Sequence, residues 1–584
     1  MPIMFPWPAL EGINLQTMTS AVFAASRYAT DPEMWANLSL KKLASLAACA
    51  VLAQCSPVIE AATGPVVDVG YARYRGAVTY NDTAAYLGVP YAQSPTGERR
   101  FRAPVPLNTK KTSSAVVDAS EYPEPCIQGS TGGGDEGGAG SEDCLRVNVY
   151  APLNATKESN LPVLVYIHGG GYVYGNPADW PFEHWIHQSP NVVIVSVYYR
   201  LDSFGFLAHP AFRSDSSLGD LNPGFLDQVE ALRWVKKHIA AFGGNPGKVT
   251  IDGQSAGGSS VELQLVTNLG EELFQAAIPQ SVYRTPVGPA EEREPQFEQF
   301  VTEAGCKGNT LKKTMACLRK ASVSALARAQ DAVSDFNVTV PYNIFTPVID
   351  GKVITQNPTK SILEGKFHKV PLLVGSTTNE SLSDTSTLDA PLKEFFPALT
   401  NKTLAEYAEV YPVSDFGDEV TRNTYATGES ELRCARSIMG HAWSGAGLPT
   451  FTYRFNQPAN PDTATSDLVF HSAENWWMFR GTNTGFNGTT TFTDMTPSEE
   501  AFAEELIAYW LSFVRAHDPS IFKLERSPAW PQYSAKTLNR IALQRPTGAD
   551  ANSTTVSGVT LEKQDSGETK RCEFVASIEK EQEN

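Results

Sequence analysis

One stretch constrains the fold of this chain more than any other: a β-branched run, a tight turn with the pattern Gly-x-Ser-x-Gly, and then small residues that begin a helix. The run is 249–251, and the turn holds Gly253, Ser255 and Gly257. A serine at the tip of a strand-to-helix turn adopts a positive φ, and glycines two residues away on either side avoid a collision there. Backbone N–H groups at the start of the helix point to the same place and can hold an oxyanion. A chance match is the alternative, but the strand before and the helix after favour a nucleophilic serine.

Composition narrows the class of protein. The chain has 584 residues, of which 42% are hydrophobic, so it can bury a large core. Its formal net charge of −17 argues against nucleic acid or an anionic membrane surface as the main partner. The length fits either several domains or one large α/β unit with insertions.

The N-terminal region has the pattern of a secretory signal. An apolar run at 43–53 follows Lys41 and Lys42, and it is too short to span a bilayer. We interpret 1–61 as an upstream extension plus a signal peptide, with its core at about 34–53, and 62–584 as a single folded domain. A buried core helix is the alternative. The preferred interpretation predicts a secreted, extracellular protein with no stable membrane anchor.

A second glycine-rich turn lies upstream of the serine. A buried-strand pattern at 161–167 continues directly into His168-Gly169-Gly170-Gly171. Three glycines after a strand let the backbone approach a ligand and expose its N–H groups. A phosphate cradle would need a Gly-Lys-Ser/Thr or G-x-G-x-x-G pattern, and an ordinary turn is the other alternative. The His-Gly-Gly-Gly pattern ahead of Gly-x-Ser-x-Gly favours an oxyanion loop.

Alternating strands and helices predict the architecture. After a strand pattern at 191–197, apolar residues recur at helical spacing over 226–242, and the strand at 249–251 follows. A strand, a crossover helix and another strand form a parallel unit. We therefore expect an α/β fold with a mostly parallel central sheet and helices on both faces.

A serine nucleophile needs a base, and the base needs an orienting group. In this architecture the chain order is Ser, then Asp or Glu, then His. The strand pattern at 370–374 leads into a loop that carries Glu380. Glu380 is therefore the predicted acid.

Three histidines follow that loop. His517 ends a helical run, His441 lies inside a helical stretch, and His471 lies on a loop after the strand pattern at 450–455. Chain order alone does not choose among these three histidines. The position of His471 on a loop favours it as the base.

Cysteine use agrees with an oxidising compartment. Six cysteines lie beyond the leader, and six allow fifteen pairings, so the sequence alone does not assign them. None has the C-x-x-C spacing of a metal site, and no cofactor or metal is expected. The six cysteines are Cys126, Cys144, Cys306, Cys317, Cys434 and Cys572. Sequons compatible with a secreted glycoprotein begin at Asn81, Asn154, Asn337, Asn401, Asn487 and Asn552.

Many short motifs in order resemble one family, the type-B carboxylesterases of the α/β-hydrolase superfamily, which includes the cholinesterases and fungal lipases. The resemblance covers about 64–575. The motifs are Gly88-Val89-Pro90-Tyr91-Ala92, Glu142-Asp143-Cys144-Leu145, His168-Gly169-Gly170-Gly171, Tyr199-Arg200-Leu201, Gly205-Phe206-Leu207, Leu226-Asp227-Gln228, Ala231-Leu232-Arg233-Trp234, Phe242-Gly243-Gly244 and Gly253-Gln254-Ser255-Ala256-Gly257-Gly258. The segment His471-Ser472-Ala473-Glu474-Asn475-Trp476 resembles fungal members in particular.

The resemblance implies roles for individual residues. Ser255 is the implied nucleophile, Glu380 the acid and His471 the base. The resemblance also implies an oxyanion hole, a support for the acid–base pair and three disulfides in a single catalytic α/β-hydrolase domain. The implied oxyanion hole consists of the N–H groups of Gly170, Gly171 and Ala256, and the implied support is Ser281. The implied disulfides are Cys126–Cys144, Cys306–Cys317 and Cys434–Cys572.

Three departures from the family pattern bear on the substrate. Gln254 stands where many members have Glu, which removes a negative charge linked to cationic substrates in cholinesterases. The Cys126–Cys144 loop has no Trp to stack on choline, and it is too short and Gly-rich for a lipase lid. Ser381 follows the acid where Gly is usual, which creates a sequon at Asn379 that we expect to be unoccupied.

The resemblance therefore implies a secreted, fungal-type carboxylic ester hydrolase that acts on a small-molecule or lipid-like ester. A lipase or sterol esterase with a long acyl tunnel and a feruloyl-type esterase are the enzymatic alternatives. The non-enzymatic alternative is a cholinesterase-like adhesion protein, which the presence of all three catalytic residue types disfavours. The sequence leaves the oligomeric state open.

Overall fold

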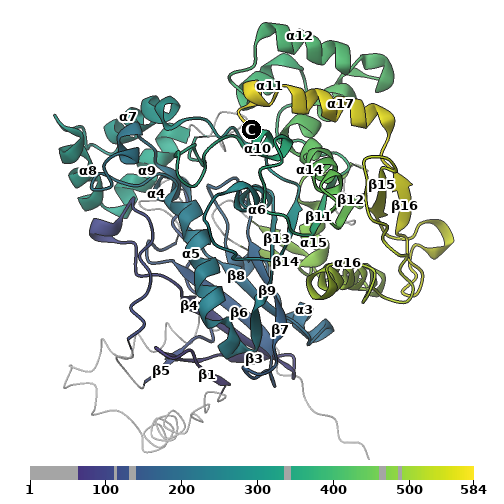
Figure 1. The fold of residues 1–584 in the computed structure, drawn as a ribbon, viewed down its shortest axis with the longest axis horizontal. Helices are drawn as coiled ribbons and strands as arrows, with labels where there is room; N and C mark the ends of the chain where they lie inside the picture. The colour runs from purple at the N-terminus through teal and green to yellow at the C-terminus, as the bar shows by residue number, and fades with distance from the viewer. Residues whose placement is uncertain (1–63, 111–114, 130–139, 335–343, 460–467, 485–489) are drawn as a thin grey trace, which may run out of the picture. The chain divides into compact units, whose positions relative to one another are not determined.

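The computed structural model describes residues 64–110, 115–129, 140–334, 344–459, 468–484 and 490–584. The predicted upstream extension and signal peptide at 1–61 lie outside the described residues. At the centre of the described chain is an 11-stranded sheet with strands in the order β16-β15-β12-β11-β10-β9-β7-β8-β6-β4-β3 (Figure 1). The run from β8 through β7, β9, β10, β11 and β12 to β15 is parallel. Antiparallel strands complete both edges.

The edge strands β3 and β16 are the shortest of this sheet, and β9 near its middle is the longest. The strands of the sheet are β3 (Ala77–Thr79), β4 (Thr83–Pro90), β6 (Arg146–Pro152), β7 (Leu161–Ile167), β8 (Val193–Val197), β9 (Gly244–Gln254), β10 (Ala276–Gln280), β11 (Leu372–Thr377), β12 (Thr450–Phe455), β15 (Asn539–Leu543) and β16 (Thr560–Lys563). Two smaller sheets are formed by β1 (Val66–Asp68), β2 (Arg73–Arg75) and β5 (Val116–Asp118), and by β13 (Thr482–Thr484) and β14 (Thr490–Phe492).

Helices cover both faces of the sheet. The α-helices are α3 (Glu183–Gln188), α4 (Asp202–Phe206), α5 (Pro223–His238), α6 (Ala256–Val266), α7 (Glu294–Glu303), α8 (Leu311–Lys320), α9 (Val323–Ser334), α10 (Pro358–Leu363), α11 (Asp389–Phe395), α12 (Asn401–Val410), α13 (Glu419–Gly428), α14 (Cys434–Gly445), α15 (Ala473–Met478), α16 (Pro497–Ala516), α17 (Ser566–Ser577) and α18 (Glu579–Gln582). The predicted doubly covered α/β architecture is therefore present.

Strand β7 shows why two covered faces are needed. Its residues are fully buried from Val163 to Ile167, because successive side chains point to opposite faces of a sheet and both faces are packed. Val165 belongs to a core cluster that includes Leu232 of α5 and Val261 of α6. Its neighbour Tyr166 belongs to a second cluster, which includes residues of α3 and α16.

Residues of three sequence motifs form two ion pairs that are largely buried. The guanidinium of Arg200 binds both carboxylate oxygens of Asp227 at 2.7 Å each, and neither side chain is exposed. Arg100 makes a similar bidentate pair with Glu142, at 2.6 and 2.7 Å. A buried charge is tolerated only when it is paired in this way. The first pair connects the segment after β8 to α5, and Arg100 also donates to backbone oxygens at the end of α8.

Three disulfides lie among the described residues, with sequence separations of 18, 11 and 138. They join Cys126 with Cys144, Cys306 with Cys317, and Cys434 with Cys572. These are the pairs that the family resemblance implied. Within the described ranges, no helix combines the length and the apolar character that crossing a membrane requires.

Several element boundaries differ from the sequence expectations. The predicted helix over 226–242 begins earlier, at Pro223, because proline is favoured in the first helical turn. It ends at His238 and continues as a 3₁₀ turn to Phe242, before Gly243 adopts a φ of 90°. Strand β9 begins at Gly244, five residues before the predicted start, because Gly244 already pairs with Leu161 of β7 ahead of a register shift.

Gly375, in the centre of β11, provides a test of this packing. A Cβ atom at this position would lie 2.1 Å from ring atoms of Tyr453 on β12. We expect Gly375→Ala to lower the free energy of unfolding by about 1–3 kcal/mol through overpacking. Denaturant unfolding would measure the change. Gly445→Ala is the matched control, because a Cβ there meets no atom within 4 Å, and equal effects of the two substitutions would contradict the prediction.

Candidate active site

Ser255 lies at the turn between β9 and α6, as the sequence predicts. Its φ is 60° and its ψ is −124°, in the region that residues other than glycine rarely adopt. A Cβ on Gly253 would lie 2.5 Å from the oxygen of Gly257, and one on Gly257 would lie 2.0 Å from the oxygen of Ile167. Both glycines are therefore required by close backbone approach, which is the reason proposed from the sequence.

His471 contacts both of its predicted partners. Its Nε2 is 2.8 Å from Oγ of Ser255, and its Nδ1 is 2.6 Å from Oε2 of Glu380. The other two histidines that order left open are placed elsewhere. His441 bonds to the oxygen of Ser437 inside α14, and His517 caps the C-terminus of α16 with a φ of 55°.

Glu380 is held in a fully buried position after β11. The backbone N–H of Thr377 donates to its Oε1 at 2.8 Å. Burial by itself would raise the pKa of Glu380, but the charge of His471 and the hydrogen bond to it outweigh burial and lower that pKa. Conversely, burial would lower the pKa of His471, and the charge and hydrogen bond of Glu380 raise it instead. The pair therefore favours a carboxylate beside an imidazole that readily accepts a proton.

The glycine loop after β7 passes directly over the serine. A Cβ on Gly169 would lie 3.0 Å from Cβ of Ser255, so a larger residue would collide with it. Gly170 and Gly171 have φ values of 102° and 61° and line the same cavity as Ser255 and His471. Ala256 is buried at the first position of α6. The three residues predicted for an oxyanion hole thus belong to the two segments that flank the serine.

His168, the first residue of this loop, packs against two aromatic rings and bonds to the loop backbone. Its ring stacks on Trp180, with ring centroids 5.6 Å apart, and on Tyr199, at 4.5 Å. Its Nδ1 is 2.8 Å from the oxygen of Gly169. Burial lowers the pKa of His168 to about 4, so the ring is neutral at physiological pH. Its place in the motif is explained by packing and a local hydrogen bond.

Two predicted supporting residues lie beside the three central ones. The hydroxyl of Ser281 donates to Oε1 of Glu474 at 3.3 Å, and its interaction with Glu380 helps lower the pKa of that acid. The amide of Asn475 donates to Oε1 of Gln254 at 3.2 Å, and both residues line the cavity.

Two buried carboxyls near His471 had no predicted role. Burial and the nearby charge of Glu380 raise the pKa of Glu474 to about 7, and burial raises the pKa of Glu431 to about 7. Both negative charges contribute to the raised pKa of His471. Glu474 lies three residues after His471, so its position in that motif was the available signal. Glu431 has no such signal in the sequence, because the burial of a single glutamate cannot be predicted from the residues around it.

The cavity above Ser255 is small, at about 60 Å³. Its walls include the aromatic rings of Tyr174, Trp180 and Tyr283 and the aliphatic side chain of Leu382. Ligand sites for drug-sized molecules occupy about 300–1,000 Å³. The space beside the serine therefore suits a small group.

The sequence predicts no metal site. One cluster of potential metal ligands is nevertheless present and needs to be considered. Among the described residues, Glu429, Cys434 and Cys572 bring ligand atoms within 4.8 Å of one another. The two cysteines form a disulfide and are not thiolates, and zinc binds cysteine as the thiolate. This cluster does not fit a metal ion.

Comparison with known proteins gives a consistent result. The family model described as the carboxylesterase family matches residues 63–574. Liver carboxylesterase B-1 of Rattus norvegicus is 30% identical over 541 residues, which cover 85% of this chain and 92% of that protein. Liver carboxylesterase of Sus scrofa is 30% identical over 555 residues, covering 86% and 92%.

Solved structures agree with the sequence relatives. The crystal structure of Aspergillus niger EstA is 29% identical, with a TM-score of 0.76, and the match covers 89% of this chain and 99% of that one. PNB esterase is 28% identical, with a TM-score of 0.70, and the match covers 87% and 100%. The solved structures and the relatives named above are all esterases.

The raised pKa of His471 predicts a specific pH dependence. The ring can activate Ser255 only when it is neutral, so labelling of the serine by a fluorophosphonate should decline as the pH falls through a midpoint above the usual 6.5. Glu380→Gln removes the largest of the charges that raise this pKa and leaves the burial that lowers it. We therefore expect the midpoint in that variant to fall below the midpoint of the wild type. An unchanged midpoint would contradict this account of the pair.

Proposed function

Because the chain belongs to the carboxylesterase family, and is therefore a carboxylic ester hydrolase, we propose that Ser255 is its nucleophile and that hydrolysis proceeds through an acyl-enzyme. One observation carries this proposal: the continuous contact from Ser255 Oγ to His471 Nε2 at 2.8 Å and from His471 Nδ1 to Glu380 at 2.6 Å. A nucleophile, a base and an orienting acid in hydrogen-bond contact are what this chemistry requires.

In the first half of the reaction, Ser255 Oγ attacks the ester carbonyl carbon while His471 Nε2 takes the hydroxyl proton. The carbonyl oxygen becomes an oxyanion, held by the N–H groups of Gly170, Gly171 and Ala256. Loss of one such donor costs about 3–4 kcal/mol of transition-state stabilisation. The carbon–oxygen bond to the alcohol then breaks, the imidazolium gives its proton to the leaving alcohol, and the acyl group remains on Ser255.

In the second half, water takes the place of the alcohol. His471 removes a proton from the water, whose oxygen attacks the acyl carbon. The second oxyanion collapses, Ser255 leaves with the proton from His471, and the free acid departs. Glu380 remains ionised throughout and stabilises the imidazolium. The lowered pKa of Glu380 supports this assignment.

We further propose that the enzyme prefers short acyl groups. The cavity of about 60 Å³ beside Ser255, with Trp180 and Tyr283 in its wall, supports this preference. The neutral Gln254 in the same wall supports an uncharged substrate. A lipase or sterol esterase would need a long acyl tunnel, and a feruloyl-type esterase would need space for an aromatic acid.

The proposed location is extracellular. Three disulfides support it, because such bonds persist in oxidising compartments. The signal pattern at 34–53 supports it as well. The proposed mature protein is one catalytic domain over 62–584, in keeping with a family match that spans 63–574. A fungal type of enzyme is supported by the similarity to Aspergillus niger EstA.

The assignment of the nucleophile can be tested directly. We expect Ser255→Ala to abolish hydrolysis of p-nitrophenyl acetate, at least about 10⁴-fold in kcat, because no acyl-enzyme can form. Circular dichroism and thermal unfolding would verify that the variant is folded. Retained turnover in the folded variant would overturn the assignment of Ser255. It would also favour a site elsewhere in the chain.

The acyl preference has its own test. We expect kcat/KM on p-nitrophenyl esters from C2 to C16 to be highest at C2–C6, because longer chains exceed the cavity. Initial rates at substrate concentrations below micelle formation would give the profile, with Ser255→Ala as the background. A maximum at C12–C16 would instead support the lipase or sterol-esterase alternative.

A further inference from the structure

A short π-helical segment lies behind the candidate site. It spans Glu429–Arg433 and joins α13 to α14 within one continuous helical rod. A single π turn within α-helix is uncommon and is often found at functional sites. All of its residues are buried. Two loops that line the site form hydrogen bonds to this segment.

The first of these is the acid loop, residues 380–383. The N–H of Leu382 donates to Oε2 of Glu431 at 2.9 Å, and the hydroxyl of Ser383 donates to the other carboxylate oxygen. A third contact joins the hydroxyls of Ser381 and Thr427, 2.9 Å apart. One buried carboxylate therefore holds two consecutive residues of the loop that carries Glu380.

The backbone of the acid itself touches the same helical rod. A Cβ on Gly428 would lie 1.3 Å from the carbonyl oxygen of Glu380. Only glycine leaves room for this approach. The distance between the rod and Glu380 is thus determined by direct contact as well as by the side chain of Glu431.

The second loop follows β10. The N–H of Arg284 donates to the carbonyl oxygen of Glu431 at 2.8 Å, and the guanidinium of Arg284 donates to the oxygen of Ser430 at 2.6 Å. The same loop carries Ser281, which contacts Glu474, and Tyr283, which lines the cavity. The π segment is therefore the common support of both loops.

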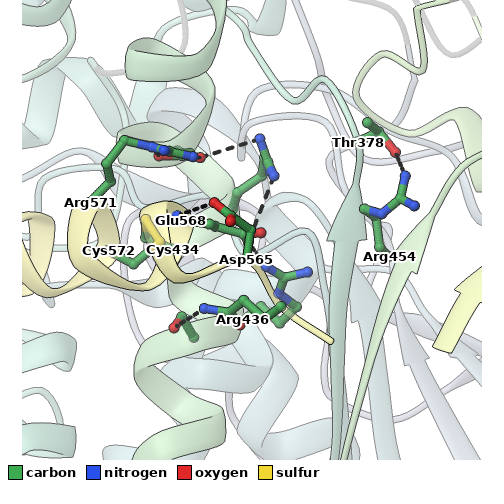
Figure 2. A network of polar contacts seen from close by, with 12 residues as sticks. Thr378, Cys434, Arg436, Arg454, Asp565, Glu568, Arg571 and Cys572 are labelled. Carbon is green, nitrogen blue, oxygen red and sulfur yellow. Dashed lines mark hydrogen bonds and ion pairs between the residues drawn. A yellow bond between two sulfur atoms is a disulfide. The ribbon is translucent and has the colours of Figure 1, made fainter. Parts of the chain in front are cut away.

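Helix α17 holds the π segment through ion pairs and a disulfide. Arg571 binds both oxygens of Glu429 at 2.8 Å each. The disulfide between Cys434 and Cys572 joins the next residue of the rod to the same helix, and Arg433 approaches Glu568. Figure 2 shows Arg571, Glu568 and the disulfide gathered around this junction. A covalent bond and buried ion pairs thus hold the segment that holds the acid loop.

When it is ionised, above its pKa of about 7, Glu431 also acts on the site through its charge. Its side chain is fully buried, and the described hydrogen bonds to its carboxylate come from neutral donors, the N–H of Leu382 and the hydroxyl of Ser383. Its charge raises the pKa of two nearby groups, His471 on the histidine loop and Tyr407 on α12. The other charged groups on the elements around it have partners of their own: Glu380 pairs with His471, the guanidinium of Arg284 binds the oxygen of Ser430, and Arg571 and Glu568 of α17 pair with Glu429 and Arg433.

We propose that Glu431 is a positioning residue of the esterase: its carboxylate holds the acid loop, and so places Glu380 and the cavity wall at Leu382. Its charge, when present, adds to the groups that favour the protonated form of His471. The proposal rests on the proposed function of Ser255, Glu380 and His471. It assigns a role in catalysis to a residue that touches neither the substrate nor the reacting atoms.

Two substitutions at this position separate the two effects. Glu431→Ala removes both hydrogen bonds, so we expect kcat on p-nitrophenyl butyrate to fall about 10-fold and KM to rise, since Leu382 lines the cavity. Glu431→Gln keeps an acceptor for Leu382 and loses the charge. We expect it to recover most of the lost kcat and to move the acid limb of the kcat/KM profile to lower pH, because His471 loses a nearby negative charge.

Glu505 provides the matched control. It is also buried, lies on α16 away from these loops, and accepts a hydrogen bond from the hydroxyl of Ser557 at 2.6 Å. Glu505→Ala and Glu505→Gln should leave kcat, KM and the pH profile as in the wild type. Thermal unfolding of all four variants would separate lost stability from lost positioning. A purely structural role for Glu431 would change the melting temperature without moving the acid limb.

The outcomes are decisive in each case. Wild-type kcat and KM in Glu431→Ala would overturn the positioning role, and an unmoved acid limb in Glu431→Gln would overturn the charge effect on His471. If Glu431→Ala does not fold, the Gln variant and its pH profile decide alone. Ser255→Ala, assayed in parallel, distinguishes this proposal from the proposed function: turnover in that variant would refute the serine mechanism, whereas an inactive Ser255→Ala with unaffected Glu431 variants would refute only the inference.

Discussion

The backbone conformation of Ser255 is the constraint on which the site depends. A φ of 60° in a residue with a side chain costs about 1–3 kcal/mol and persists only where the surroundings require it. Three hydrogen bonds supply that requirement: Ser255 N–H to Gln280 on β10, Tyr283 N–H to the Ser255 oxygen, and Ser259 N–H to the same oxygen. The strained turn is thus held jointly by a neighbouring strand, a loop and its own helix.

The same sheet brings the other site residues to the serine. The strands β9, β10, β11 and β12 are consecutive neighbours in a parallel array. Ser255 follows the first, Ser281 the second and Glu380 the third, and His471 lies on the connection after the fourth. The carboxyl ends of parallel strands lie at one edge of a sheet, where open α/β folds bind their ligands. Residues more than two hundred positions apart therefore meet because of strand order.

Much of this arrangement was predictable from local patterns. Strands β7 and β12 have the predicted bounds, because each is a run of mostly apolar, aromatic or β-branched residues that stops at a polar residue, His168 after β7 and Asn456 after β12. The positive φ of Ser255 followed from its two glycines. The contacts of His471 agree with the choice made on chain order and loop position, although the pattern around His441 and His517 offered no exclusion by itself.

What escaped prediction depends on burial and on tertiary contacts. Glu431 and Glu474 are ordinary glutamates in helical sequence, and only the packed structure removes them from water and raises their pKa values. The cysteine pairs could not be chosen among fifteen by residue spacing and came from family resemblance. The 3₁₀ ending of α5 likewise depends on Gly243, which approaches Ala155 on a distant turn.

The disulfide between Cys434 and Cys572 closes a span of 138 residues and ends beside the segment that supports the acid loop. Such a bond forms only where thiols are oxidised. Before oxidation, the chain has the residues of the site but lacks the covalent part of the brace behind them. The covalent part of this brace is thereby linked to oxidising conditions, because a reduced chain would have only the ion pairs between the segment and α17.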